Sequence, residues 1–239
     1  IAGLEVVEPA VRPPPREMTG FDRELIDLGP VGEAHDVETS VRREVLRDQF
    51  RLLFQPEIEL ATGRVRRAEA LVRWQHPDQG LLQPREFIPL AEAGNLVHLV
   101  TEWMLDAALR ACRRWQDAGL ETGVSVNLSP RSLRDTALPQ SIAAALESAG
   151  LEARWLTLEI TEGSLLADPE HAIALPRQIL ATGVGLSIDD FGTGYSSLAH
   201  LKQLPASEIT IDRSFVRDMI RNQHDAALVH SMIDLGHNV

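Results

Sequence analysis

Oxygen-bearing side chains recur at every second position of several short apolar segments. In these segments Val126, Leu158 and Ile188 take one face of the expected strand, and polar residues take the other. The charged or amide members at or near the strand ends are Glu69, Asn127, Glu159, Asp189 and Asp212. If the sheet closes into a barrel, these side chains meet at one end, where carboxylates and an amide suit Mg²⁺ or Mn²⁺. The alternative is that they are solvated positions on separate strands.

The segment 186–197 places two adjacent carboxylates, Asp189 and Asp190, where an apolar strand enters a glycine-containing loop. One interpretation is an ordinary turn, because Asp and Gly are common turn residues. The other is a metal site, because neighbouring carboxylates repel each other unless a divalent cation lies between them. This segment by itself is compatible with both interpretations.

Other kinds of site lack support in the sequence. The eight histidines show no HExxH-type pairing for zinc, and no G-x-S-x-G nucleophile motif occurs. Cys112 is the only cysteine, so no intrachain disulfide can form and a reducing, cytoplasmic location is expected. We find no signal-peptide pattern and no apolar run near eighteen residues, so a membrane tether would have to lie in segments outside this sequence.

The net charge of -12 is inconsistent with a protein that coats nucleic acid, and we expect no DNA partner. An anionic ligand would need cations to mediate its binding, which agrees with the metal interpretation. At 239 residues with 44% hydrophobic content, the chain is large enough for one large core or for a domain plus an appendage.

Strands alternate with helices along most of the chain, which is typical of an α/β fold with a mostly parallel sheet. The predicted strands are 50–60, 64–74, 124–128, 156–160, 185–189 and 208–212. The first two form an antiparallel hairpin, because only a three-residue turn separates them. The predicted helices are 37–49, 84–93, 96–118, 132–149, 168–181, 196–203 and 215–235, the last of which is either one helix or a pair. Residues 1–36, which include three consecutive prolines, are interpreted as a linker or the tail of a preceding domain.

Five motifs follow in an order and spacing that resemble the EAL-domain family of cyclic di-GMP phosphodiesterases. They are AEALVRW at 68–74 with FIPLAE at 87–92, VNLS at 126–129, EITE at 159–162, DDFGTGYSSL at 189–198 and IDRSFV at 211–216. The three letters of the family name would be a weak signal alone, whereas five ordered motifs are specific. The resemblance covers residues 50–239, and the domain is taken as 37–239.

The resemblance implies a TIM-like (β/α)8 barrel whose first strand is antiparallel. It also implies hydrolysis of one phosphodiester bond of cyclic di-GMP to linear pGpG, assisted by two Mg²⁺ or Mn²⁺ ions. The positions that match metal ligands are Glu69, Asn127, Glu159, Asp189 and Asp190. Those that match catalytic or loop-bracing residues are Glu69, Asp189, Asp190 and Glu162, and those that match substrate contacts are Gln55, Arg73, Thr161 and Asp212.

Two features depart from the family pattern. The family has a lysine two residues before the Asp of IDRSF, where this chain has Thr210, and a hydroxyl cannot replace a positioned ammonium. The six predicted strands also fall short of the eight that such a barrel has, so the last two are expected to be missing and the chain alone inactive. A degenerate domain that acts as a cyclic di-GMP receptor or a protein-interaction scaffold is therefore the alternative to the enzyme.

The resemblance also implies partners. The ligand would be cyclic di-GMP, and a homodimer would form through the loop and helix around 190–203. An upstream sensor or GGDEF domain in the parent chain is compatible with the proline-rich start.

Overall fold

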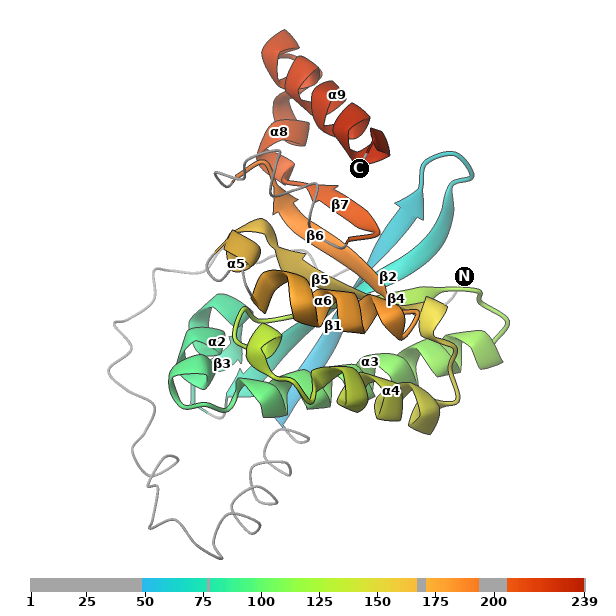
Figure 1. Ribbon diagram of the computed structural model, residues 1–239, viewed down its shortest axis with the longest axis vertical. Coiled ribbons are helices and arrows are strands. Elements are labelled where there is room, and N and C mark those ends of the chain that lie inside the picture. Colours follow the sequence, from blue (N-terminus) through green and yellow to red (C-terminus); the bar gives the residue numbers. More distant parts are fainter. Residues whose placement is uncertain (1–48, 77, 167–170, 194–205, 239) are drawn as a thin grey trace, which may run out of the picture. The chain divides into compact units, whose positions relative to one another are not determined.

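The structure is a computed structural model that describes residues 49–76, 78–166, 171–193 and 206–238 (Figure 1). They all belong to one compact unit, Ser40–Val239. The predicted helix at 196–203, the predicted helix start at 168–169 and, except for Gln49, the predicted helix at 37–49 lie outside the described residues.

A long antiparallel hairpin begins the sheet. Strand β1, Phe50–Glu59, pairs with β2, Arg64–His76, from Phe50 opposite Trp74 to Glu59 opposite Arg64. The turn between them uses Gly63 at φ +69°, a left-handed conformation that glycine adopts without steric cost. A further short strand, β3 (Gly80–Leu82), pairs with the end of β2. Strand β3 was not predicted, because three residues are too few to show an alternating pattern.

Four parallel strands extend the sheet from β2. They are β4 (Gly123–Asn127), β5 (Leu156–Thr161), β6 (Gly185–Phe191) and β7 (Glu208–Ile211), in the order β1-β2-β4-β5-β6-β7. The α/β fold with an antiparallel first strand pair is thus confirmed. Within the described residues, β1 pairs only with β2 and β7 only with β6, so these strands form an open sheet.

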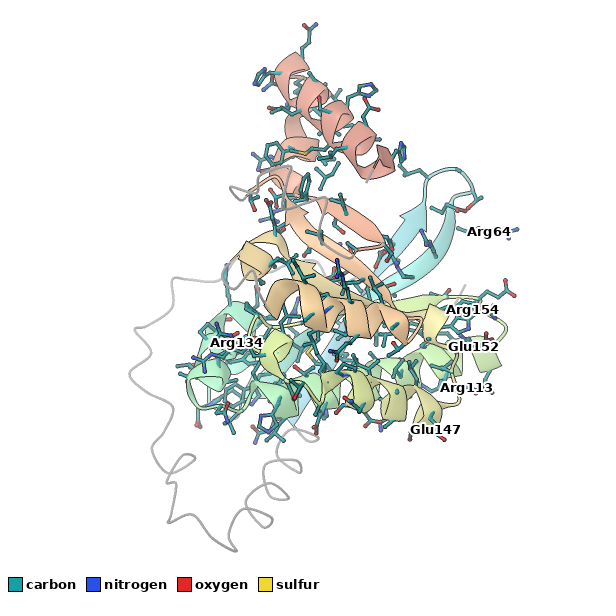
Figure 2. All side chains as sticks on the ribbon, viewed as in Figure 1. Arg64, Arg113, Arg134, Glu147, Glu152 and Arg154 are labelled. Atoms are coloured by element: carbon teal, nitrogen blue, oxygen red, sulfur yellow. The ribbon has the colours of Figure 1, made fainter. Side chains whose placement is uncertain are left out.

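Helices cover the apolar face of this sheet (Figure 1). The main ones are α2 (Pro84–Ala93), α3 (Val97–Asp117), α4 (Leu138–Ala149) and α6 (His171–Ala181). The sheet contributes Ala70, Val126, Leu158 and Ile188, each at most 3% exposed, to the core beneath them. The charged side chains of Arg113 and Glu147 lie on the outer surface of this helical layer (Figure 2).

The observed helices differ in detail from the predicted ones. The segment 132–149 is divided into a short 3-10 helix, Ser132–Arg134, and α4, because Asp135 forms a turn by accepting a hydrogen bond from the Ala137 amide. A five-residue helix, α5 (Glu162–Leu166), follows β5 directly and was missed. The last segment, predicted as one helix or a pair of helices, is a pair, α8 (Arg213–Asp218) and α9 (Gln223–Asn238). None of the helices in the described ranges has the length and hydropathy of a membrane span.

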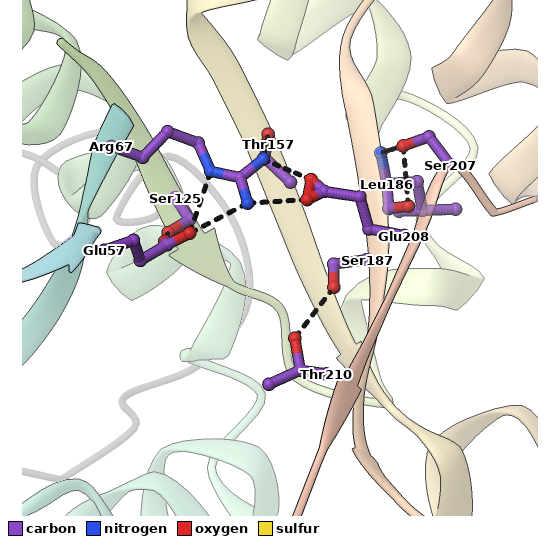
Figure 3. Close-up of polar contacts among 9 residues, drawn as sticks. All are labelled: Glu57, Arg67, Ser125, Thr157, Leu186, Ser187, Ser207, Glu208 and Thr210. Carbon is purple, nitrogen blue, oxygen red and sulfur yellow. Dashed lines mark hydrogen bonds and ion pairs between the residues drawn. The ribbon is translucent and has the colours of Figure 1, made fainter. Parts of the chain in front are cut away.

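A cluster of charges crosses the polar face of the sheet at the amino ends of the parallel strands (Figure 3). Arg67 on β2 donates to Glu57 on β1 at 2.8 Å, to Glu208 on β7 at 2.6 Å and to Thr157 on β5 at 2.8 Å. Burial would raise the pKa of Glu208, but the hydrogen bond and charge of Arg67 lower it below the usual range. Arg67 therefore ties strand β7, which has a strand partner on one side only among the described residues, to the hairpin.

Candidate functional site

The polar face carries the predicted metal-binding residues in one group of neighbouring strands. Asn127 at the end of β4 is paired in register with Glu159 on β5, and Thr161 of β5 with Asp189 on β6. The Asn127 side-chain amide donates to Glu69 Oε1 on β2 at 2.7 Å. The structure thus brings together side chains that are up to 120 residues apart in the sequence.

The carboxylates of this group raise one another's pKa. Glu159 is 7% exposed, and its pKa is raised to about 8 by burial first and then by the charges of Glu69, Glu57 and Asp189. The pKa of Glu69 is also raised, chiefly by burial, although the hydrogen bond from Asn127 opposes the rise. A site of this kind favours any cation, including a proton, that reduces the repulsion.

The donor set fits a hard divalent cation, because the carboxylate and amide groups present only oxygens as metal donors. Among the residues that the structure describes, however, no group of three or more His, Cys, Asp or Glu side chains is placed to hold a metal ion. The carboxylates interact electrostatically but form no ready-made cage, so an ion would have to draw them together.

The second acidic position lies in an unusual backbone conformation. Asp190 has φ +53°, which is rare for a residue with a side chain, and the β6–β7 register is irregular between Ile188 and Phe191. Burial and the charges of Asp189 and Asp212 raise the pKa of Asp190. The predicted strand ended at Asp189, but β6 continues to Phe191, so the Asp-Asp pair belongs to the strand end and not to a simple turn.

Glu162 and the start of the loop are directly connected. Glu162 begins α5, is 2% exposed and accepts a hydrogen bond from the Gly192 amide at 2.9 Å. The Thr193 hydroxyl donates to the Asp190 carbonyl at 2.8 Å. The first bond holds Gly192 against α5, and the second closes the turn 190–193 on itself.

Three of the predicted substrate contacts come from strands β1, β2 and β5. Gln55 on β1 lies opposite Glu69, and Arg73, two pleats further along β2, donates to the Val72 carbonyl. The Thr161 hydroxyl is 2.5 Å from that of Ser164. The positions therefore share the polar face, and Arg73 uses a backbone group as its hydrogen-bond partner.

Asp212 has a structural role that the sequence analysis did not identify. Its carboxylate caps helix α8 by accepting from the Ser214 amide at 2.9 Å. The hydrogen bond from the Ser214 hydroxyl, followed by that from the Ser214 amide, lowers the pKa of Asp212. An Asp two residues before a Ser at a helix start is a common capping signal, so the sequence did contain it.

One further residue of the site, Glu57, was not predicted from the sequence. Glu57 on β1 accepts a hydrogen bond from the Ser125 hydroxyl, and its charge raises the pKa of both Glu69 and Glu159. Glu57 lies two residues after Gln55, so alternation along β1 would have identified it.

A cavity of about 330 Å³ opens at the opposite ends of the parallel strands. Arg66, Trp155, Gly185 and Glu208 are among its lining residues, and none of the predicted site residues lines it. A Cβ atom at Gly123, also in its lining, would lie 3.2 Å from Arg67 Cγ, so glycine leaves room for the charge cluster of Figure 3. The candidate functional site is therefore the cluster of Glu69, Asn127, Glu159 and Asp189, and not this cavity.

Comparison with known proteins gives a consistent family match. A model of the EAL domain matches residues 38–239. MucR of Pseudomonas aeruginosa, described as a bifunctional diguanylate cyclase/cyclic di-GMP phosphodiesterase, is 42% identical over 197 residues, which are 82% of this chain and 29% of MucR. NbdA of the same organism, described as a cyclic di-GMP phosphodiesterase, is 42% identical over 214 residues, which are 89% of this chain and 27% of NbdA. The chain thus spans less than a third of the length of either relative.

Solved structures agree with the fold. The phosphodiesterase of MucR in complex with cyclic di-GMP has a TM-score of 0.75 at 41% identity, covering 85% of this chain and 83% of that one. The EAL domain of FimX from Pseudomonas aeruginosa, bound to cyclic di-GMP, has a TM-score of 0.74 at 26% identity, covering 85% and 81%.

Proposed function

Because the chain belongs to the EAL domain family, we propose that it hydrolyses one phosphodiester bond of cyclic di-GMP to give linear pGpG. The observation that carries the proposal is the pairing of Asn127 with Glu69 beside the buried Glu159, on the face that also holds Asp189. The description of both MucR and NbdA as cyclic di-GMP phosphodiesterases supports the same reaction.

We assign the metal site to the acidic group on the polar face. Glu69, Asn127, Glu159 and Asp189 would hold one Mg²⁺ or Mn²⁺, and Asp189 with Asp190 a second. When bound, such ions stabilise charge on the phosphate oxygens and lower the pKa of an attacking water. Glu162 would act through the Gly192 amide, as a positioning residue for the loop.

The remaining residues would bind the substrate. Arg73 has a planar guanidinium suited to a phosphate, and burial lowers its pKa while the charge of Glu69 opposes that shift. Gln55 and Thr161 offer an amide and a hydroxyl on the same face, and Asp212 offers a carboxylate close to Asp190. The acidic site would thus bind cations, and the cations together with Arg73 would bind an anionic dinucleotide.

Metal affinity should increase with pH in the range below about 8. The pKa of Glu159 is raised to about 8, so at neutral pH this group holds a proton that a divalent ion must displace. One displaced proton predicts a change in Kd of about tenfold per pH unit. Calorimetric titration with Mn²⁺ at pH 6, 7 and 8.5, in buffers of different ionisation enthalpy, measures both the Kd and the proton release. A Kd that is constant between pH 6 and 8 would contradict the assignment of Glu159 as a ligand.

A second function, that of a cyclic di-GMP receptor or scaffold, is favoured by one observation. Thr210 stands at the family's lysine position, and its hydroxyl is 3.1 Å from that of Ser187. This hydrogen bond offers no positive charge to a reacting phosphate. FimX, whose EAL domain was solved with cyclic di-GMP bound, shows that a relative of this fold holds the dinucleotide.

The two functions are separated by product analysis on the protein as its gene encodes it. Incubation with cyclic di-GMP and either Mg²⁺ or Mn²⁺, followed by chromatography, should yield pGpG, and chelation of the metal should stop its formation. Binding of the dinucleotide without pGpG would favour the receptor. If the protein neither binds nor hydrolyses cyclic di-GMP, the protein-interaction scaffold is the function that remains.

The domain and partner assignments are part of the proposal. We propose residues 37–239 as the EAL domain and 1–36 as a linker or the tail of a preceding domain. MucR, which is described as also a diguanylate cyclase, supports a GGDEF or sensor domain upstream. The homodimer predicted around 190–203 depends largely on residues 194–203, which lie outside the described residues, and it stays a prediction, as does the cytoplasmic location.

A further inference from the structure

Two apolar side chains lie directly against the loop that follows the Asp-Asp pair. A Cβ atom built on Gly192 would lie 2.5 Å from Cε of Met232 and 3.0 Å from Cε2 of Phe215. Met232 belongs to α9 and Phe215 to α8, the two helices that follow β7. Gly192, at φ +98°, therefore leaves space that these two side chains fill.

The opposite side of the same loop is held by hydrogen bonds. The Gly192 amide donates to Glu162, and Asp190 is in the left-handed region at φ +53°. A non-glycine residue in this region is strained, and surrounding contacts must maintain it. The loop therefore has a polar anchor on α5 and an apolar cover from α8 and α9.

Both covering helices are themselves fixed to the sheet. On α9, Val229, Met232 and Gly236 recur at helical spacing; Val229 is 6% exposed, and a Cβ at Gly236 would lie 3.8 Å from Ile209 Cδ1 on β7. Phe215 is in the first turn of α8, whose start is set by the Asp212 cap. The positions of Met232 and Phe215 over Gly192 thus follow from contacts with strand β7 and its end.

We propose that Phe215 and Met232 are positioning residues that keep Asp190 in its left-handed conformation, and so set the affinity of the site for its second divalent ion. This inference rests on the proposed function in one respect, the assignment of Asp190 to that ion. The first ion should be affected much less, because three of its four proposed ligands, Glu69, Asn127 and Glu159, lie on β2, β4 and β5, and only the shared Asp189 lies on the strand that leads to Gly192.

The direct test is hydrogen exchange at the Gly192 amide in the metal-free protein, measured by NMR. Met232→Ala and Phe215→Ala should each speed this exchange about tenfold, since the covering contact is lost while the Glu162 partner remains. Met232→Leu should restore most of the protection, because leucine conserves volume. Ile233→Ala is the matched control, since Ile233 is the next residue of α9 and is 43% exposed.

A Mn²⁺ titration of the same variants connects the packing to the site. Met232→Ala should weaken the second Mn²⁺ about tenfold and leave the first within about twofold, and Met232→Val should fall between alanine and leucine. Melting temperatures of the same variants separate this effect from a general loss of stability. Ile233→Ala shortens a side chain of α9 but keeps the contact between Met232 and Gly192, and Met232→Val removes only part of that contact.

The outcomes distinguish this inference from the proposed function. Unchanged Gly192 exchange in both alanine variants, or equal weakening of both Mn²⁺ ions, overturns the inference. If the unsubstituted protein binds no Mn²⁺, the proposed metal site fails, and faster Gly192 exchange in Met232→Ala would then support the packing role alone.

Discussion

Glu69→Gln should reduce cyclic di-GMP hydrolysis by about 10³-fold or more and, at the same time, make the metal-free protein no less stable. Activity should fall because a neutral amide is a poorer ligand than a carboxylate for the divalent ions that would polarise the phosphate and the attacking water. The effect on stability follows from the raised pKa of Glu69, which burial causes and neighbouring carboxylates increase. A carboxyl group whose pKa is raised in the folded state destabilises that state when it is ionised. Its replacement by a neutral amide should therefore raise the free energy of unfolding above neutral pH.

The measurements are initial rates of pGpG formation, Mn²⁺ affinity and melting temperature at pH 8. Glu147→Gln, an identical change at an exposed position of α4, serves as the matched control and should alter none of them. Retention of more than a tenth of the activity by Glu69→Gln would contradict the assignment of Glu69. A receptor without turnover would still be expected to lose Mn²⁺ affinity in this variant.

Thr210→Lys should increase the rate of hydrolysis about 10²–10³-fold, with a larger effect on kcat than on KM. A positioned donor at a developing negative charge typically contributes that much. Thr210 is exposed on the polar face of β7, next to Ser187, so a lysine has space to extend along the face. The ammonium would also reduce the repulsion among the neighbouring carboxylates.

Thr136→Lys adds the same charge at an exposed position between Arg134 and α4 and is the control for a general charge effect. A large gain from Thr210→Lys in a protein that otherwise only binds the dinucleotide would identify a degenerate receptor. An active protein whose rate does not change would show that its chemistry does not need this ammonium, and would contradict the prediction.

Local patterns in the sequence predicted the strands well, for a simple geometric reason. The pleat of a strand forces alternate side chains to opposite faces, so Glu159 and Thr161 could be assigned to one face from order alone. Short elements were not predicted. Strand β3 has three residues and helix α5 has five, which are too few to show the alternation of a strand or the repeat of about 3.6 residues in a helix. The motifs were sufficient to predict the family, since five of them in one order and spacing are specific.

The details of the candidate site depend on contacts between distant segments. Sequence alone determined that the chain is an α/β protein of the EAL family with an acidic face at the strand ends. Only the tertiary structure decided that Asn127 donates to Glu69, that Glu57 raises the pKa of Glu159, and that helix α9 covers Gly192. The physical reason is that side-chain direction is a local property of the backbone, whereas distances between carboxylates depend on strand register and helix packing. Register and packing are set by contacts across the whole fold.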